Sequence, residues 1–498
     1  MADSEKVHAG KHLQKYIKNT PWYLLSSLLT KAMGFILLPI FTNYLTPEEF
    51  GTLSTIESLG RVLPIFISIY LDASFNRFYY KERELSNDRV RLLFSSHFWF
   101  ILFWGLGVCL SSLFILPSIT DGLNGVTLPI LIIVVFTQLM NQLAIMTTLI
   151  WRANLLAKRL AIFQISISII SLLLTIYLLT FVELGWVSRV YALSGMAFLQ
   201  FIVLIFIAVK NEWLRFEVDF SLLKRSLKFC LPLVPNIAAG WVAMFSDRLI
   251  LAHYDKLGEA GIYSIAAQIA MLMYVINDAI TKVQGPIAMS GMIENLSEAK
   301  AKMASFTLGY LSIITVFYLS LVLFSKEVVY YFTNANYLNA FHLVPILAMV
   351  YIFSGVYRVF TNVVSFHNQM WIISASAFIQ VFINLLLNFI FIPKFGMYAA
   401  AYSTLISIIA YTAFIFIASQ RISKIILNYI EILKLIVLVA ICLLVVHLLN
   451  NFFEVGYILL LIKFIILFCI IYSSMCLKSN KYFKDKLSKF FASKFASK

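Results

Sequence analysis

Charge is scarce in this chain, and acidic residues are the scarcest. Only 13% of the 498 residues are charged, with 24 Asp and Glu against 39 Lys and Arg, whereas 61% are hydrophobic. The apolar residues come in continuous runs of about twenty, the length that an α-helix needs to cross a ~30 Å hydrocarbon core. Continuous runs disfavour strands, and in lipid only helices or a closed barrel satisfy every backbone group. The sequence therefore predicts an all-α polytopic membrane protein.

The hydropathy pattern predicts about fourteen transmembrane helices. The expected spans cover roughly residues 21–43, 50–71, 92–116, 127–150, 160–182, 187–209, 227–250, 260–281, 303–324, 342–364, 370–392, 397–419, 427–449 and 457–477. The first apolar run is too long for a cleaved signal peptide and has no small-residue cleavage site behind it, so we expect it to act as a signal anchor.

Several features of enzymes and pumps are missing. The five cysteines lie scattered through apolar spans, without the paired spacing of a metal site or a disulfide framework. No connection exceeds about twenty-five residues and no GxxxxGK[ST] sequence occurs, so an ATP-driven pump would need a motor from another chain. The outer loops are short and mostly uncharged, which disfavours a membrane glycan polymerase or acyltransferase. We therefore predict no enzymatic activity, no catalytic residue and no metal site.

Basic residues concentrate in loops of one parity. The stretch before span one and the loops after spans two, four, six, eight and twelve hold most of the Lys and Arg. The positive-inside rule assigns these loops, and with them both termini, to the cytoplasm. Most of the formal net charge of +15 is then topogenic and needs no nucleic-acid partner. The lysine-rich tail, residues 478–498, suits anionic lipid headgroups.

The chain repeats itself with a period of about 210 residues. The repeat is visible in "YLTPEEFGTLS" (44–54) and "YDKLGEAGIYS" (254–264), and again in "LGWVSRVYALS" and "FGMYAAAYSTL". Each repeat holds six spans, and an even number of spans inserts both halves in the same direction. We expect two six-helix bundles, residues 1–214 and 215–420, related by a pseudo-two-fold axis along the membrane normal. Residues 421–498 add two helices and the basic tail.

One longer stretch has a family resemblance. Residues 19–59 read "NTPWYLLSSLLTKAMGFILLPIFTNYLTPEEFGTLSTIESL". This stretch resembles the amino-terminal signature of the Wzx-type polysaccharide (O-antigen) flippases of the multidrug/oligosaccharidyl-lipid/polysaccharide exporter superfamily. "FNRFYY", "FSDRLILAHYDKLGEAGIYSIAAQIA" and "IPKFGMYAAAYSTLIS" are similar to further family segments, so the resemblance reaches about residue 420.

The resemblance implies a fourteen-helix fold of two bundles in the bacterial inner membrane. The implied function is to flip an undecaprenyl-diphosphate-linked oligosaccharide, such as an O-antigen repeat unit for lipopolysaccharide, from the cytoplasmic to the outer leaflet. The implied partners are that oligosaccharide, membrane lipids and the polysaccharide polymerase and chain-length proteins. No cofactor is implied.

Basic residues inside spans are the candidate substrate contacts. A cation at mid-membrane costs a few kcal/mol and usually faces a cavity or a partner. A lipid diphosphate that crosses a low-dielectric interior needs fixed cations to compensate its charge. Lys31 and Arg61, near the middle of spans one and two, are the leading candidates, and Arg248 and Arg358 could complete a cationic lining.

Structural interpretations stand beside this one. Glu57 lies one turn before Arg61 and could pair with it. Lys31 could bind backbone carbonyls freed near Pro39, and the other two arginines lie near enough to an interface to snorkel. Lys463, in an appended helix near the outer face, is also expected to snorkel.

Acidic residues inside spans are the candidates for ion coupling. They are Glu57, Asp247 and Asp278, and Glu57 is the deepest. Asp278 has Lys282 four residues on, so a helix-end ion pair is a second interpretation of that residue. The main rival function is a multidrug exporter of the same superfamily. An exporter of organic cations is expected to line its cavity with carboxylates, whereas the mid-membrane charges here are mostly basic.

Overall fold

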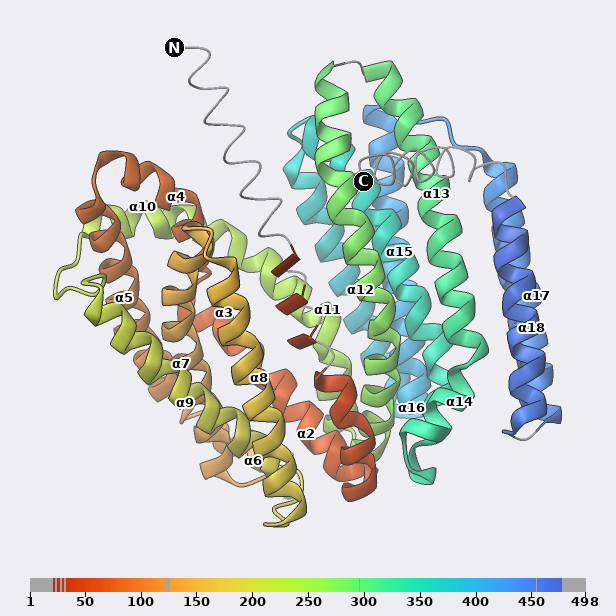
Figure 1. Cartoon of the computed structure of the whole chain (residues 1–498), viewed down its shortest axis with the longest axis horizontal. Helices are drawn as coiled ribbons and strands as arrows, with labels where there is room; N and C mark the ends of the chain where they lie inside the picture. Colours follow the sequence, from red (N-terminus) through yellow and green to blue (C-terminus); the bar gives the residue numbers. More distant parts are fainter. Residues whose placement is uncertain are drawn as a thin grey trace, which may run out of the picture. The chain divides into compact units, whose positions relative to one another are not determined.

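The computed structural model of the chain describes residues 21–22, 25–26, 29–30, 33–121, 126–294, 296–453 and 455–476. Every regular element in these residues is a helix (Figure 1), which confirms the predicted all-α class. Lys31 and the basic tail lie outside the described residues.

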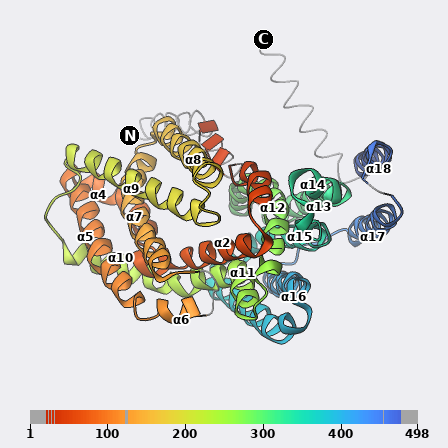
Figure 2. The same ribbon diagram turned by 90° about the horizontal axis from the view of Figure 1, so that it is seen from below.

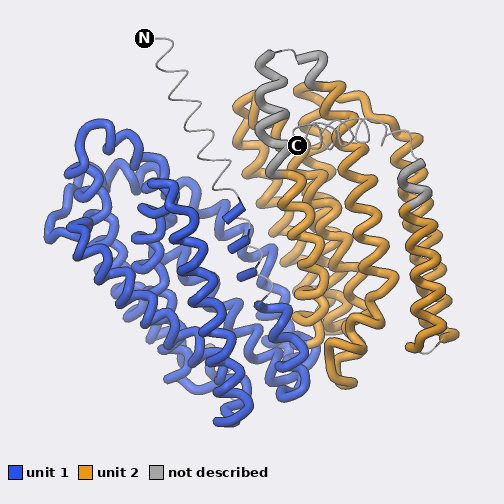
Figure 3. The backbone as a smooth tube through the Cα atoms, in the orientation of Figure 1, with its two compact units in different colours: residues 1–261 blue, residues 262–498 orange. Residues whose placement is uncertain are grey.

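The helices group into two compact units (Figure 3). Unit 1, residues 1–261, holds a first helix over Met33–Tyr44, then α2 (Pro47–Gly60), α3 (Leu63–Ser68), α4 (Leu71–Leu85), α5 (Asn87–Ser112), α6 (Leu116–Asp121), α7 (Leu128–Ala153), α8 (Ala157–Thr180), α9 (Val187–Lys210), α10 (Phe220–Cys230), η1 (Leu231–Leu233), α11 (Val234–His253) and the start of α12 (Leu257–Glu294). Unit 2, residues 262–498, holds the rest of α12, then α13 (Leu296–Leu323), α14 (Ser325–Phe332), η2 (Ala335–Tyr337), α15 (Ala340–Phe366), α16 (Met370–Ile422), α17 (Tyr429–Phe452) and α18 (Tyr457–Cys476). The repeat boundaries at 214 and 420 stay a prediction.

The described helices make the chain a multi-pass membrane protein. Ten of them are long and apolar enough to cross a bilayer, and the bent pair Pro47–Ser68 and Leu71–Leu85 raises the number to eleven. α16 merges two expected spans across a kink at Gly396, which has a φ of 54°. Two shorter apolar helices, Met33–Tyr44 and Tyr457–Ile471, overlap parts of the first and last expected spans. The total of fourteen stays a prediction.

The second expected span is broken rather than continuous. α2 begins with a capping box, in which the Thr46 side chain accepts from the Glu49 backbone N–H at 3.3 Å and the Glu49 carboxylate accepts from Thr46 at 2.9 Å. The helix ends at Gly60, and Pro64 stands in the first turn of α3, where its missing N–H costs nothing. The break puts Arg61 at the C-cap of α2 instead of inside a continuous helix.

α2 and the first turns of α12 cross at two glycines within unit 1. A Cβ atom on Gly51 would lie 1.9 Å from the Leu257 carbonyl oxygen, and one on Gly261 would lie 2.1 Å from the Pro47 carbonyl oxygen. The helices therefore touch backbone to backbone at this point, which only residues without a side chain allow.

Unit 2 packs α15 against α13 and α16, and α17 and α18 against α13. Figures 1 and 2 show α17 and α18 side by side. The core between α15 and α16 includes Phe360 and Ile415, and the rings of Tyr357 and Tyr411 stack with their centroids 3.7 Å apart.

Lys463 corrects a prediction. Its side chain is 0% exposed, and its Nζ donates to both carboxylate oxygens of Glu327, at 2.7 and 2.8 Å, and to Asn450 Oδ1 at 2.9 Å. The predicted snorkelling is wrong because the side chain points to α14 and α17 rather than to an interface. A charge that stays buried needs such a partner.

Candidate functional site

Arg61 lies at the centre of a charged cluster in unit 1. Its side chain is 59% exposed, and its guanidinium lies 3.9 Å from Glu57 Oε2. The helical pair that the spacing suggested is therefore present. At 3.9 Å with this exposure the pair is weak, since ion pairs accessible to solvent contribute about 0–1 kcal/mol. Arg61 is held near Glu57 without being buried by it.

Glu57 has a second cationic partner that the sequence did not single out. Arg189, in the first turn of α9, has its Nε 3.6 Å from Glu57 Oε1. The guanidinium also donates to Thr175 Oγ1 at 3.2 Å and to Ser171 Oγ at 3.4 Å, both on α8. Each oxygen of the Glu57 carboxylate thus faces one arginine. We call Glu57, Arg61 and Arg189 the Glu57 cluster; it holds one more positive than negative charge.

An aromatic ring on α11 brings Arg248 near this cluster. The guanidinium of Arg61 lies 5.3 Å from the centroid of the Phe245 ring, and that of Arg248 lies 5.8 Å from the same centroid. Both distances allow a cation–π interaction. The Trp241 indole N–H donates to the Ser58 carbonyl at 3.1 Å and ties α11 to α2. Two arginines predicted as substrate contacts therefore share one ring.

Asp247, which precedes Arg248 in the sequence, is more deeply buried than Arg248. Asp247 is 1% exposed, whereas Arg248 is partly exposed and donates to the Met244 carbonyl at 3.1 Å. The ion-coupling role of Asp247 stays a prediction, but a proton or ion would have to reach a buried carboxylate.

Arg358 and Asp278 meet in unit 2. The Arg358 guanidinium lies 3.5 Å from Asp278 Oδ1, within 3.4 Å of Thr281 Oγ1, and 5.8 Å from the Tyr274 ring centroid. The sequence predicted both residues but did not predict that they pair. The suggested pair of Asp278 with Lys282 involves a side chain outside the described part of the chain. A carboxylate beside Arg358 offsets the charge that it could offer to an anion.

A third ionic cluster joins α4, α5 and α10. Glu82 is buried, and it pairs with Arg89 at 3.0 Å and with Arg225. Arg89 also reaches Asp219 at 3.3 Å. The Ser221 hydroxyl donates to Asp219 at 2.6 Å and lowers the pKa of that carboxyl. Arginines that the sequence assigned to topology therefore also hold helices together.

Metal binding has no donor set in the described residues: they contain no group of three or more His, Cys, Asp or Glu side chains placed to hold an ion. Of the three ionic clusters, only the Glu57 cluster has more guanidinium groups than carboxylates among the described residues.

Comparisons with known proteins agree with the fold. Comparison with curated protein sequences gives no match. Among solved structures, the lipid II flippase MurJ in an inward closed conformation has a TM-score of 0.71 at 16% identity, over 93% of this chain and 98% of that one. An inward-facing multidrug resistance MATE family transporter of the MOP superfamily has a TM-score of 0.61 at 14% identity, over 82% and 95%. A MOP superfamily transporter from Pyrococcus furiosus has 0.54 at 13% identity, over 82% and 97%.

At these identities the likeness concerns the fold alone. The sequence itself matches a family model over residues 16–292, more than half of the chain, and that family is described as polysaccharide biosynthesis protein. The match confirms the family resemblance read from the sequence, and the chain belongs to the polysaccharide biosynthesis protein family.

Proposed function

We propose that this protein flips an undecaprenyl-diphosphate-linked oligosaccharide, such as an O-antigen repeat unit, from the cytoplasmic to the outer leaflet of the bacterial inner membrane. Family membership links the chain to polysaccharide assembly. A flippase of a lipid-linked precursor has a similar fold over 93% of the chain. In this proposal both termini are cytoplasmic, the two six-helix bundles alternate access, and a polymerase and chain-length proteins use the product.

The observation that carries the proposal is the arrangement around Phe245. Arg61, Arg189 and Arg248 lie around one carboxylate, Glu57, and one ring. With the buried carboxylate of Asp247 counted as well, guanidinium groups outnumber carboxylates by three to two among these described residues of unit 1. A membrane protein keeps such an excess only where it faces a cavity, a partner or a ligand. A diphosphate supplies several anionic oxygens, and guanidinium groups bind such oxygens through paired N–H donors. Arg61, as the exposed member, is the proposed first contact.

The other predicted substrate contacts, Lys31 and Arg358, have less structural support than Arg61. Lys31 keeps its role as a proposed contact from its place in the sequence alone. Arg358 would have to exchange Asp278 for the diphosphate, so we propose that it binds later or more weakly than Arg61. Glu57 is proposed to orient its two arginines, with ion coupling as the alternative role.

The rival transporter is a multidrug exporter, since MATE transporters have the same fold. An organic cation would be repelled by the excess of arginines around Phe245, which favours an anionic cargo. A membrane glycan polymerase or acyltransferase is the weaker candidate, because the solved structures that resemble the chain are described as a flippase and transporters.

The test of the function uses vesicles that contain the purified protein and a fluorescent undecaprenyl-diphosphate oligosaccharide. We expect the protein to expose the inner-leaflet pool to an external quencher, and Arg61→Glu to stop this exposure. Transport of a fluorescent organic cation with no movement of the glycolipid would instead favour the exporter.

A further inference from the structure

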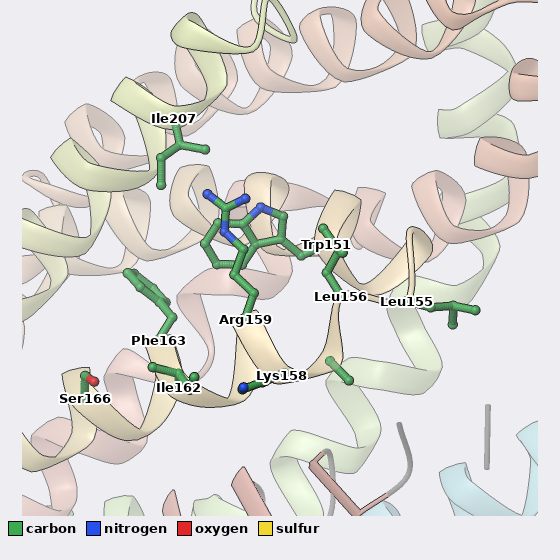
Figure 4. Close-up of a pocket in the computed structure, with 10 residues that line it drawn as sticks. Trp151, Leu155, Leu156, Lys158, Arg159, Ile162, Phe163, Ser166 and Ile207 are labelled. Atoms are coloured by element: carbon green, nitrogen blue, oxygen red, sulfur yellow. The ribbon is translucent and has the colours of Figure 1, made fainter. Parts of the chain in front are cut away.

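A groove of about 700 Å³ lies in unit 1 where α7 turns into α8 (Figure 4). Its walls come from three helices: Trp151 at the end of α7, Ile162 and Phe163 on α8, and Ile207 on α9. Lys158 and Arg159 stand in the first turn of α8 at the same groove. The volume falls in the range of small-molecule sites, about 300–1,000 Å³.

The two cations of the groove have no acidic partner among the described residues. Neither Lys158 nor Arg159 forms an ion pair with any residue that the structure describes, although Arg89 and Arg225 of the same unit do. Both are exposed, and each lies over an aromatic ring instead: Lys158 Nζ is 5.8 Å from the centroid of the Trp22 ring. The Arg159 guanidinium carbon lies 4.6 Å from the Trp151 ring centroid. The groove therefore offers two positive charges that no carboxylate of the described residues neutralises.

Trp151 adds a hydrogen-bond donor. The residue is 1% exposed, and its Nε1 has no acceptor among the described residues. A buried donor without an acceptor costs free energy, so such groups are rare unless a ligand or water satisfies them. Figure 4 shows the Arg159 guanidinium beside this indole. If an anionic oxygen binds Arg159 and moves its guanidinium off the Trp151 ring, that oxygen can accept from both the guanidinium and the indole N–H.

Apart from Ser166, the rest of the groove is lined by apolar residues, and it follows α8, most of whose surface is not covered by the protein. α8 is a candidate span, and only 17% of its most apolar 18-residue window is buried inside the protein. Ile162, Phe163 and Ile207 provide hydrocarbon surface next to the two cations. Cations at one end and hydrocarbon along the wall match the headgroup and acyl chain of a phospholipid.

We propose that this groove binds an anionic glycerophospholipid of the cytoplasmic leaflet, with its phosphate on Lys158 and Arg159 and one acyl chain along Ile162, Phe163 and Ile207. The leaflet follows from the positive-inside assignment of the loop between spans four and five. The inference rests on the groove alone and does not depend on the flippase proposal.

The experiment measures lipid binding by native mass spectrometry of the full-length protein, delipidated in detergent and titrated with palmitoyl-oleoyl phosphatidylglycerol. The site variant is Lys158→Gln/Arg159→Gln. The matched control, Lys224→Gln/Lys228→Gln, removes two exposed positive charges from α10, outside the groove. We expect the first phosphatidylglycerol to bind about tenfold more weakly to the site variant and less than about twofold more weakly to the control.

A second variant tests the apolar wall with the cations intact. Ser166 is exposed at the groove on α8, so Ser166→Trp should fill space without removing charge and should also weaken phosphatidylglycerol binding. Zwitterionic phosphatidylcholine should bind equally to all variants. Equal losses in the site and control variants, or no loss in either groove variant, would overturn the proposal. So would a groove that retains undecaprenyl diphosphate in preference to phosphatidylglycerol, because the site would then belong to the carrier lipid.

Discussion

Gly51 and Gly261 occupy equivalent positions of the sequence repeat, and their helices cross reciprocally. A Cβ on Gly51 would strike the carbonyl of Leu257, and a Cβ on Gly261 would strike the carbonyl of Pro47, the residue equivalent to Leu257. Reciprocal contacts between equivalent residues are what a local two-fold axis produces. Superposition of residues 1–214 on 215–420 by rotation about the membrane normal stays a prediction.

A methyl group at this crossing should destabilise the protein. Gly51→Ala and Gly261→Ala each force backbone apart from backbone, and overpacking of this kind costs about 1–3 kcal/mol. We expect a lower thermal unfolding temperature of the purified protein for both variants. Gly195→Ala on α9 is the control, because a Cβ there meets nothing within 4 Å. If Gly51→Ala unfolds like Gly195→Ala, the close crossing is not present in the membrane.

Charge inversion at Arg61 should abolish surface polysaccharide while the protein still inserts at near-normal levels. A carboxylate at this position repels the diphosphate, whereas alanine only removes an attraction, so Arg61→Ala should do less damage and Arg61→Lys should keep partial function. Lys31→Glu should act like Arg61→Glu. Surface polysaccharide is measured in a strain without the chromosomal gene, together with the amount of protein in the membrane.

The control for charge inversion is Arg421→Glu, an exposed arginine at the end of α16. Normal transport by both Lys31→Ala and Arg61→Ala would show that these cations do not bind the substrate, although the flippase function could survive on other residues.

Glu57 and Arg189 should behave as one unit. Since Glu57 faces two arginines, Glu57→Ala and Arg189→Ala should not add: we expect a coupling of about 0.5–3 kcal/mol in a double-mutant cycle of unfolding. If Glu57 only orients arginines, Glu57→Gln should keep partial transport with or without a proton gradient. Complete loss in Glu57→Gln together with loss of gradient dependence would assign ion coupling to Glu57.

Removal of one partner of the buried ion pair between Glu327 and Lys463 in unit 2 should destabilise the protein. Glu327→Gln leaves the Lys463 charge without its carboxylate, and such losses cost about 3–5 kcal/mol. Glu327→Gln/Lys463→Met should recover much of the lost stability, because no unpaired charge is left. Glu212→Gln, which breaks a pair whose carboxylate side chain is 71% exposed and leaves Arg91 its pair with Asp88, is the control and should change the unfolding temperature little. A mild effect of Glu327→Gln would contradict the buried ion pair.

The orientation can be tested by reporter fusion. A periplasm-active reporter should be silent after Lys498 and active near Asp121, because the basic loops predict cytoplasmic termini. The reverse pattern would reject the topology.

The fold class was predictable because each long apolar run indicates a membrane-spanning helix by itself, whatever the rest of the chain does. The left-handed turn between α3 and α4 was not. Ile69 and Tyr70 have φ values of 49° and 60°, which composition does not favour. Distant side chains satisfy the backbone there: the Trp104 indole donates to the Phe66 carbonyl at 2.9 Å, and the Cys230 thiol donates to the Tyr70 carbonyl at 3.2 Å. No local sequence pattern predicts hydrogen bonds from such distant side chains.

The candidate site also contains some contacts that the sequence predicts and others that it does not. The pair of Arg61 and Glu57 follows from helical spacing and was predicted as an alternative. Arg189 lies at the start of the expected span 187–209, and its only sequence signal is its place in the repeated segment "LGWVSRVYALS". Phe245 is one of 44 phenylalanines, so nothing in the sequence separates it from those that face lipid. The snorkelling predicted for Lys463 was wrong because its partner Glu327 lies 136 residues away in the sequence.

That separation also sets an order during biosynthesis. The ribosome makes Glu327 first, and the carboxylate has no Lys463 to bind until α18 emerges 136 residues later. The arriving lysine can then leave the translocon beside a waiting partner, which removes most of the cost of placing it in lipid. A chain cut before α18 keeps an acidic residue with no counter-charge at this site. Nascent chains that stop there should be recognised and degraded by membrane quality control, even though every earlier helix is complete.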